Sequence, residues 1–320
     1  MTQPAKAMRD AFLTRLLEAM KQDYRLFFVT ADFGSPVIDR IRAEHPDRFV
    51  NVGIAEQNLI NVSAGLALEG YTVFAYAIAP FITMRCYEQI RVSLALLSEV
   101  RPMNVNLIGV GAGYSYVVSG PTHQCYEDLT IMRGLPNLGL LSPSDHVTTA
   151  ALFDVCLARK QPKYLRLDAQ VLPVIHAEGA PDLNRGFASL REEGQTCLIA
   201  TGYPVHTALQ VADRMAATGR KLSVIDLFDI AGFDRAAFLK TLVPYQAIVT
   251  LEEGFKGRGG VDAMMFDLLA REPHRPLLNL GVAPGYRFEL GSRAQLHEQV
   301  GIGPEAVQRG ISAFLDRNGL

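Results

Sequence analysis

The sequence predicts an α/β protein with two domains, each a doubly wound parallel sheet covered by helices on both faces. Short apolar runs alternate with segments of helical spacing along the whole chain. The runs are continuous rather than alternating with polar residues, which is typical of parallel strands buried on both faces. The alternation breaks once, at the polar Gly/Pro stretch HAEGAPDLNRG, residues 176–186. Glycine and proline mark linkers. We therefore expect domains over residues 1–180 and 190–320, with a boundary near residue 185.

In the first half, apolar residues at helical spacing predict a helix from Met8 to Met20. A second helix is expected over Leu59 to Leu68, closed by Gly70, since glycine favours helix ends. Ser144 or Asp145 could cap a helix that starts before Val147. The expected strands are residues 26–30, 72–77, 104–110, 138–143 and 163–167.

In the second half, the same alternation predicts strands at residues 196–201, 222–227, 247–253 and 277–282, with helices from about Val205 and near Phe233. The run EEGFKGRGG, residues 252–260, is rich in glycine but lacks the spacing of a phosphate-binding P-loop. We interpret it as a turn into a helix.

Composition excludes several classes of protein. The chain has 31 Lys and Arg against 33 Asp and Glu, a net charge of −2, so it lacks the basic stripe of a nucleic-acid-binding protein. The sequence contains no run of about 18 apolar residues, the length that a membrane span requires. The first residues, MTQPAKAMRD, lack the apolar core of a secretion signal. Four widely spaced cysteines predict reduced thiols in the cytoplasm rather than disulfides or structural zinc: Cys86, Cys125, Cys156 and Cys197.

For a few polar residues, a catalytic or binding role and an ordinary structural role are both consistent with their position in the sequence. Glu56, in FVNVGIAEQN, falls at the expected start of a helix, where a carboxylate is favoured by the helix N-terminus. His123, in SGPTHQ, follows a Gly-Pro turn, and loops carry function more often than packing. Arg85, Arg91 and Arg166 could each bind an anion or form an ordinary ion pair. Taken singly, none of these residues is specific.

Their order along the chain is specific. The first half contains NVGIAEQN, then Phe81 with RCYEQIR, then GPTHQCYEDLTIMRGLPN, SPSD and YLRL. The second half contains IATGYPVHTAL, VIDLFDI, IVTLEEG and GSRAQLHEQVGI. This series resembles the thiamine-diphosphate-dependent transketolase family and its relative deoxyxylulose-phosphate synthase, over nearly the whole chain.

The resemblance covers only the second half of a full-length transketolase. The N-terminal domain of such enzymes holds the cofactor diphosphate through magnesium with a GDG motif, and this sequence has no GDG. The resemblance is therefore to the small, C-terminal subunit of a split transketolase, with a pyrimidine-binding domain over 1–180 and a transketolase C-terminal domain over 190–320. It implies a diphosphate-binding partner subunit that carries the magnesium ligands, none of which is expected here. Two copies of each chain would form an α2β2 heterotetramer.

The resemblance also implies roles for four residues. Glu56 matches the glutamate that hydrogen-bonds a ring nitrogen of the aminopyrimidine and favours its imino tautomer. Phe81 matches the aromatic residue that stacks on this ring, and Asp32, in TADFGSP, matches an acid near the cofactor. His123 matches the histidine that contacts the donor oxygens and assists proton transfer.

Two arginines match residues that bind anionic substrate groups. Arg166 corresponds to an arginine that meets the substrate phosphate at the far end of the channel, and guanidinium geometry suits phosphate. Arg85 corresponds to a second anion-binding arginine of the synthase branch. No catalytic residue is expected in the second domain, whose main role would be in dimer contacts.

The sequence departs from the family on the substrate side. Ser119 stands where both branches usually have an aspartate that binds a sugar hydroxyl, and Gly111 stands where sugar-phosphate transketolases have a histidine. Tyr114 and Tyr116 fill a stretch that is usually Gly-rich and acidic. We therefore expect a small-molecule sugar substrate with an altered donor or acceptor.

Two other functions are compatible with the same features. The β subunit of a 2-oxoacid dehydrogenase complex shares the two-domain layout, although GPTHQCYEDLTIMRGLPN fits transketolases better. A non-catalytic partner could also have kept the fold, because fold alone does not confer function. Retention of Glu56, Phe81 and His123 together favours a two-carbon ketol transferase.

Overall fold

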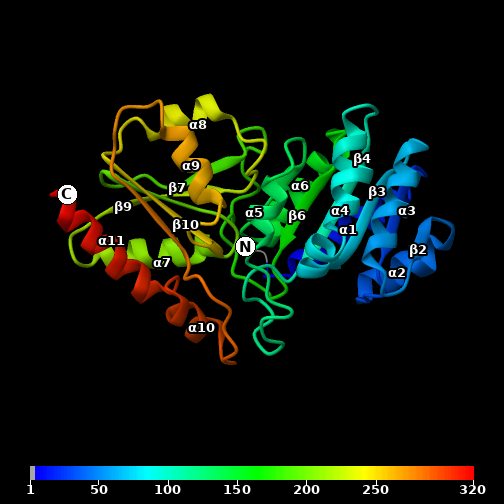
Figure 1. Ribbon diagram of the computed structural model, residues 1–320, viewed down its shortest axis with the longest axis horizontal. Helices are drawn as coiled ribbons and strands as arrows, with labels where there is room; N and C mark the ends of the chain where they lie inside the picture. Colours follow the sequence, from blue (N-terminus) through cyan, green and yellow to red (C-terminus); the bar gives the residue numbers. More distant parts are fainter. Residues whose placement is uncertain (1–3) are drawn as a thin grey trace.

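The computed structural model describes residues 4–320. Two sheets lie one after the other along the long axis of the molecule (Figure 1). The first is all parallel, with strand order β2-β1-β3-β4-β6-β5, and the second has the order β11-β10-β8-β9-β7. The predicted fold class, two domains with parallel-sheet α/β architecture, is confirmed.

The first sheet is formed by β1 (Leu26–Thr30), β2 (Phe49–Asn51), β3 (Thr72–Ile78), β4 (Asn104–Val110), β5 (Gly139–Leu141) and β6 (Lys163–Leu167). Its helices are α1 (Met8–Met20), α2 (Pro36–Glu44), α3 (Glu56–Leu68), α4 (Tyr87–Gln89), α5 (Asp128–Arg133) and α6 (His146–Ala158). A 3-10 turn covers Pro46–Arg48, and two π-helical stretches, Phe81–Arg85 and Ile90–Leu96, flank α4.

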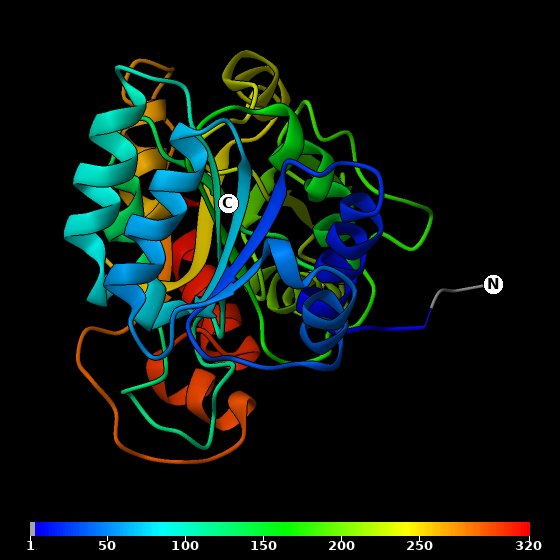
Figure 2. The same cartoon turned by 90° about the vertical axis from the view of Figure 1, so that its right-hand side faces the viewer.

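Helices cover both faces of this sheet (Figure 2). One face packs against α1 and α6, through residues such as Phe12 and Phe153. The other face packs against α3 and the π-helical stretches, through residues such as Ile60 and Leu94. Every residue of β4 is buried, as expected for a central strand with apolar neighbours on both faces.

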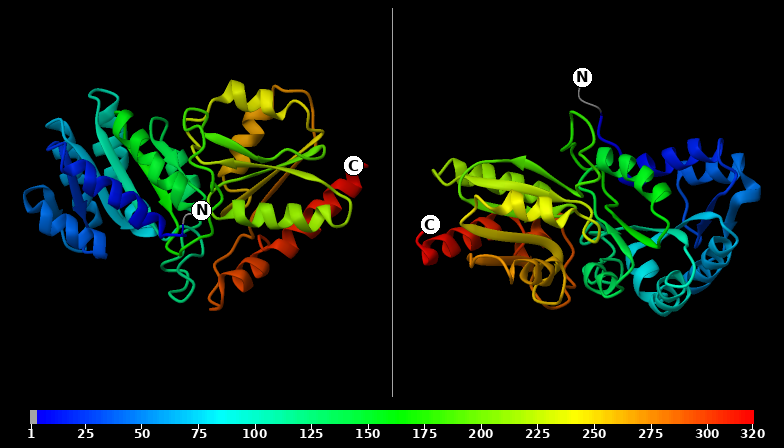
Figure 3. Two further views of the ribbon diagram at one scale, coloured as in Figure 1. Left: turned by 180° about the vertical axis from the view of Figure 1, so that it is seen from behind. Right: turned by 90° about the horizontal axis from the view of Figure 1, so that it is seen from above.

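The second sheet is formed by β7 (Phe187–Arg191), β8 (Thr196–Ala200), β9 (Leu222–Leu227), β10 (Ala247–Phe255) and β11 (Leu277–Val282). Its helices are α7 (Pro204–Ala216), α8 (Arg235–Leu242), α9 (Val261–Leu269), α10 (Arg293–Val300) and α11 (Pro304–Asn318). The views from behind and above show α7 and α11 on one face and α8 and α9 on the other (Figure 3).

The sequence analysis missed one strand of this sheet and shortened another. β7 pairs antiparallel with β9 at the sheet edge, and only Phe187 of its five residues is buried, so it lacks the continuous apolar pattern. β10 continues past the expected end at residue 253 to Phe255, so Gly254 and Phe255 lie in a strand and not in the expected turn. The carboxylates of Glu252 and Glu253 are both buried and both have partners. Glu252 accepts from the amides of Val261 and Asp262, each at 3.0 Å, and the partners of Glu253 are described below.

Backbone pairing joins the two domains. The Ser142 amide donates to the Phe228 carbonyl at 2.8 Å, and the Ile230 amide donates to the Leu140 carbonyl at 2.8 Å. The edge of the first sheet thereby continues into the segment after β9. This pairing fixes the second domain beside the carboxyl ends of β4 and β6.

The linker between the sheets is held by a second set of contacts. The Asp145 side chain caps α6 through the Thr148 amide and also accepts from the amides of Ile175 and His176, at 2.9 and 2.8 Å. His176 Nε2 lies 3.0 Å from Asp226 Oδ2 at the end of β9. One acid thus caps a helix and anchors the linker.

Two features of the structure bear on the expectations from composition: the length and polarity of the helices, and the state of the cysteines. Across residues 4–320, every helix is too short or too polar to cross a bilayer. Within the same range, all four cysteines are buried and free.

Candidate functional site

The predicted site residues follow neighbouring strands of the first sheet. Asp32 comes after β1, Glu56 after β2, Phe81 after β3 and His123 in the long loop after β4. In the order β2-β1-β3-β4, β2 is added on one side of β1 and β3 on the other, so the strand order reverses between β1 and β3. Ligands of open parallel sheets bind beyond the carboxyl ends of the strands at such a switch point. The strand order therefore brings Asp32, Phe81 and their neighbours to the edge where a ligand is expected.

Glu56 is the first residue of α3 and is only 4% exposed. A buried carboxylate requires a donor or a cation, and the amides at a helix start favour a negative charge. Arg85 supplies the cation, with Nη1 2.9 Å from Glu56 Oε1. Among the side-chain contacts of residues 4–320, this is the one hydrogen bond or ion pair of the Glu56 carboxylate.

Phe81 begins the π-helical stretch that ends at Arg85. The wide turn places the two side chains together, with Arg85 Cζ 3.6 Å from the centre of the Phe81 ring. The His123 ring meets the same Phe81 ring edge-on at 5.3 Å, and Phe33, next to Asp32, lies 6.5 Å from it. Phe81 is thus the common neighbour in this group.

His123 is half-buried, and its Nδ1 lies 2.9 Å from the Thr122 hydroxyl. The Tyr116 ring stands edge-on to the His123 ring, with centres 6.5 Å apart. Tyr116 covers Gly111, where an added Cβ would come within 2.0 Å of the ring. Gly111 also has a φ of 101°, which favours glycine. The tyrosine therefore takes the space that a side chain at Gly111 would need.

Asp32 has a left-handed backbone with a φ of 60°. Such a conformation is costly for a residue other than glycine and persists where neighbouring contacts impose it. Asn51, at the end of β2, provides them: its amide oxygen accepts from the Asp32 amide at 3.1 Å, and its amide nitrogen donates to Asp32 Oδ1 at 3.0 Å. The exposed Asp32 carboxylate is thereby held at the strand edge.

Ser119 lies exposed in the same loop as His123. Its carbonyl accepts from the Thr122 hydroxyl at 3.5 Å, and its amide donates to the Tyr116 carbonyl. These contacts order the loop and leave the Ser119 side chain at the surface. The structure places Ser119 near the cluster in sequence but gives it no contact with Glu56, Phe81 or Arg85.

Arg166 lies apart from these residues, and its contact with a substrate phosphate stays a prediction. It is 2% exposed within β6, where Nε donates to Asp128 Oδ2 at 2.9 Å and Nη2 donates to the Glu253 carbonyl at 2.9 Å. Burial opposes its charge, but Asp128 and Glu253 outweigh it and raise the Arg166 pKa. The Tyr164 hydroxyl also donates to Asp128. These contacts join Arg166 to both domains.

Sequence reasoning also missed an ion network at the domain interface. Arg293, at the start of α10, pairs with Asp168 after β6 and with Glu253 of β10, at 2.5 and 2.8 Å. His297 Nε2 lies 2.6 Å from Glu253, and the Tyr203 ring stacks on Arg293 at 3.6 Å. Burial favours the neutral acid, but Arg293 and His297 outweigh it and lower the Glu253 pKa. The sequence does contain a sign of this network, because two adjacent acids, Glu252 and Glu253, end the apolar run of the predicted strand.

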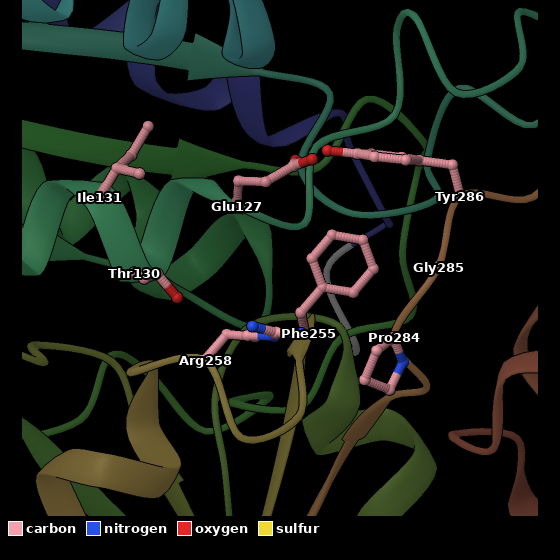
Figure 4. Close-up of a pocket in the computed structure, with 8 residues that line it drawn as sticks. All are labelled: Glu127, Thr130, Ile131, Phe255, Arg258, Pro284, Gly285 and Tyr286. Atoms are coloured by element: carbon pink, nitrogen blue, oxygen red, sulfur yellow. The ribbon is translucent and has the colours of Figure 1, made fainter.

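A separate cavity of about 410 Å³ opens between the two domains (Figure 4). Phe255 at the end of β10 and Tyr286 after β11 form its aromatic walls, with ring centres 5.7 Å apart. The Tyr286 hydroxyl points toward the Glu127 carboxylate, and Arg258 lies at the opposite side. None of the predicted site residues lines this cavity.

Residues 4–320 contain no group of three or more His, Cys, Asp or Glu side chains arranged to hold a metal ion. The chemistry that the edge offers comprises a buried carboxylate, an aromatic face and an imidazole. These are the groups that a flat, hydrogen-bonding heterocycle requires, so the residues present fit an aminopyrimidine ring.

Comparison with known proteins decides the family. The transketolase pyrimidine-binding domain matches residues 4–174, and the transketolase C-terminal domain matches residues 187–307. The chain belongs to the transketolase family. Transketolases depend on thiamine diphosphate, so membership implies this cofactor.

Two relatives of this transketolase chain are named as transketolase subunits. It is 30% identical to the 6-deoxy-6-sulfo-D-fructose transketolase subunit SqwH of Clostridium sp. (strain MSTE9), over 97% of this chain and 95% of the relative. It is also 30% identical to a subunit of the apulose-4-phosphate transketolase of Actinobacillus succinogenes, over 95% of this chain and 96% of the relative. The resemblance to a small transketolase subunit is therefore confirmed.

Solved structures agree with this family assignment. A split-gene transketolase described as an inactive β4 tetramer superposes with a TM-score of 0.84 at 28% identity, covering 98% of this chain and 99% of that one. A full-length transketolase from Pichia stipitis superposes with a TM-score of 0.79 at 18% identity. This chain covers 47% of the Pichia protein, and that likeness shows the fold alone.

Proposed function

We propose that this chain is the small subunit of a two-chain transketolase that transfers a two-carbon ketol unit between sugar substrates. The observation that carries the proposal is a chain of contacts where the parallel strands of the first sheet end: Arg85 joins Glu56 to Phe81, and Phe81 meets His123. The names of its relatives support the two-chain form. The bound cofactor supplies the chemistry, since thiamine diphosphate stabilises a carbanion next to a former carbonyl.

Glu56 and Phe81 hold and orient the aminopyrimidine in this proposal. The Phe81 ring provides a stacking face, and the Glu56 carboxylate accepts a hydrogen bond from a ring nitrogen once that nitrogen carries a proton. Burial of Glu56 beside the ring strengthens that bond, because a site removed from water weakens competing hydration. The cofactor would thus meet one rigid helix start and one aromatic side chain.

His123 and Asp32 act on the substrate side and the cofactor side of the same edge. The contact between His123 Nδ1 and Thr122 fixes the ring, which leaves Nε2 to exchange a proton with a donor hydroxyl. Asp32 is presented rigidly by Asn51 and can accept from a cofactor or partner amide. Neither residue has to move to take up its role.

A partner chain covers this edge in the proposal and carries the diphosphate and magnesium ligands. Exposed apolar side chains surround the cluster, which is unusual for a surface left in water. In the described chain they lie next to Glu56, beside Arg85, in the His123 loop and in the neighbouring 283–292 loop: Ile54, Met84, Val118, Phe288 and Leu290. The two loops lie next to one another at the lower end of the molecule (Figures 1 and 2). Two copies of each chain would form the α2β2 enzyme.

The donor is a sugar that differs from the common ketose phosphates. Tyr116 over Gly111 and the exposed Ser119 alter the wall next to His123. Arg166 is committed to Asp128, so Arg85 is the arginine at this edge that remains for an anionic substrate group. The named substrates of the relatives carry a sulfonate or a phosphate, which supports an anionic sugar.

Calorimetric titration with thiamine diphosphate and magnesium tests the proposal. We expect tight binding in a mixture with the partner chain and weak binding by this chain alone. Glu56→Gln and Phe81→Ala should each reduce ketol transfer by about a hundredfold or more, because tautomer control and stacking are lost. Glu88→Gln is the matched control, since Glu88 is exposed on α4 and pairs only with Arg91 within residues 4–320.

Three outcomes would contradict the proposal. Tight cofactor binding by this chain alone would show that a partner is unnecessary. Absence of binding in the mixture would favour a non-catalytic role. Decarboxylation of 2-oxoacids by the mixture, without ketol transfer, would identify a dehydrogenase β subunit instead.

A further inference from the structure

The Arg85 side chain contacts the two groups that the aminopyrimidine needs. Its guanidinium lies above Phe81, with Cζ 3.6 Å from the ring centre, and its Nη1 donates to Glu56 at 2.9 Å. A guanidinium and an aminopyrimidine with a protonated ring nitrogen are both planar cations, and each can donate an N–H to a carboxylate. One aromatic face and one carboxylate cannot serve both groups at once.

We propose that Arg85 is an internal mimic of the cofactor ring, which closes the pyrimidine site until the cofactor displaces it. This inference rests on the proposed function and adds a residue that sets cofactor affinity and entry rate. Glu56 is almost fully buried and has Arg85 as its one charged partner in the described chain. Such a carboxylate is costly without a cation, so Arg85 compensates its charge whenever the pyrimidine is elsewhere.

The Arg85 side chain can move away from Glu56 without a change in the backbone of the π-helical stretch. Its side chain is 47% exposed, so the guanidinium has solvent on its outer side. The Arg85 backbone is held separately from its side chain, because the side-chain amide Nε2 of Gln57 donates to the Arg85 carbonyl at 3.3 Å. The long, flexible stem of arginine can therefore swing outward while Phe81 and Glu56 stay in position.

Displacement also links the two roles of Arg85. In the observed position the guanidinium pairs with Glu56. In the open position that we infer, it would lie at the rim of the site. An anionic group on the donor sugar could bind there only after the pyrimidine has entered. The order of binding would then be cofactor first and substrate second.

The measurable consequence is a reduced cofactor affinity in the wild type. When only a fraction of molecules has the site open, the apparent dissociation constant is raised by the inverse of that fraction. A half-exposed ion pair combined with a cation–π contact corresponds to about a tenfold effect. Arg85→Ala should therefore lower the dissociation constant of thiamine diphosphate about tenfold and raise its association rate.

The test measures binding rather than turnover, in the reconstituted two-chain complex with magnesium. Calorimetry gives the dissociation constant, and stopped-flow fluorescence gives the association rate. Arg85→Met retains an apolar stem without the charge and should behave like Arg85→Ala, which guards against a folding defect in one variant. Arg85→Lys keeps the charge but loses the flat fork and should lie between them and the wild type. Arg91→Ala, on the following helical stretch with Glu88 as its partner, should match the wild type.

The outcomes separate this inference from the proposed function. Unchanged or weaker cofactor binding in both Arg85→Ala and Arg85→Met, with binding still lost in Glu56→Ala, would reject the mimic and leave the proposed function standing. Failure of the wild type and of every Arg85 variant to bind would reject both. Tighter and faster binding in both variants, dependent on Glu56, would support both.

Discussion

The domain interface and the carboxyl edge of the first sheet both place buried acids beside arginines, but the arginines are held differently. At the interface, Arg293 is buried and bonds to Asp168 and Glu253 at once. At the edge, Arg85 is half exposed and bonds to Glu56 through one nitrogen. The first arrangement has several partners on fixed elements, and the second has a single exchangeable one.

This difference separates charges that hold the fold from charges that are available for chemistry. A buried group with every partner supplied by the protein loses those partners only when the domains separate. A buried carboxylate with one mobile cation can accept a ligand in its place. The number and burial of partners, more than the presence of an ion pair, therefore distinguishes Glu56 from Glu253.

The largest expected effect comes from breaking the interface. Arg293→Ala leaves Glu253 and Asp168 buried without their cation, so the free energy of unfolding should fall by about 3–5 kcal/mol. Denaturant unfolding measures this loss. Arg220→Ala removes an exposed pair with Asp316 and should cost less than about 1 kcal/mol.

The same measurement on the edge sharpens the contrast. Glu56→Ala removes a buried charge together with the one ion pair that it makes within residues 4–320, so the free energy of unfolding should stay within about 1 kcal/mol of the wild type. A loss in Glu56→Ala as large as that in Arg293→Ala would mean that both acids are structural.

The residues most readable from sequence were those whose role depends on local pattern. Strands buried on both faces, such as β4, and the helix from Met8 to Met20 follow directly from apolar spacing. Asp145 as a helix cap follows from its position before α6. β7 was missed because an edge strand with one buried and four half-buried residues leaves little apolar signal.

Long-range partners were beyond the sequence pattern. Arg166 in YLRL matched a phosphate-binding residue, but its role depends on Asp128 and on Glu253, 38 and 87 residues away in the chain. The contact between Arg85 and Phe81 was equally hidden, because it depends on a π-helical turn. Family resemblance identified the edge, and only packing revealed which arginine stands there.

A second, smaller effect concerns the wall beside His123. Tyr116→Ala opens a space over Gly111, so the donor should be positioned less well and kcat/KM for the ketose donor should fall about tenfold. Cofactor affinity should not change, because Phe81 and Glu56 keep their contacts.

Steady-state kinetics with a panel of ketose phosphates and sulfonates measures the effect. Tyr114→Phe is the control from the same loop, since it removes only a buried hydroxyl that has no hydrogen-bond partner among residues 4–320. An equal loss in both variants would place the effect in the loop as a whole and not in the wall formed by Tyr116.

The smallest effect lies in the linker, where a buried pair responds to pH. Burial lowers the pKa of His176, but the hydrogen bond and charge of Asp226 and the charge of Asp145 outweigh it, so the pKa is raised. The fold therefore favours protonated His176. That contribution is complete below about pH 6.5, the usual histidine value, and is lost as pH rises through the higher pKa of the folded protein.

Thermal unfolding between about pH 6 and pH 8.5 detects this contribution. The wild-type Tm should fall with rising pH, and His176→Gln should remove the part of the fall that belongs to the pair. His274→Gln, at an exposed histidine, should keep the wild-type slope. Asp145 caps α6 and accepts from the His176 amide, so the pair of His176 and Asp226 lies where the linker meets this helix. Loss of the pair should lower Tm without affecting cofactor binding at the edge that contains Glu56. A pH-dependent change in cofactor affinity in His176→Gln would show instead that the linker and the edge are coupled, and that structural and functional charges are less separate than the partner counts indicate.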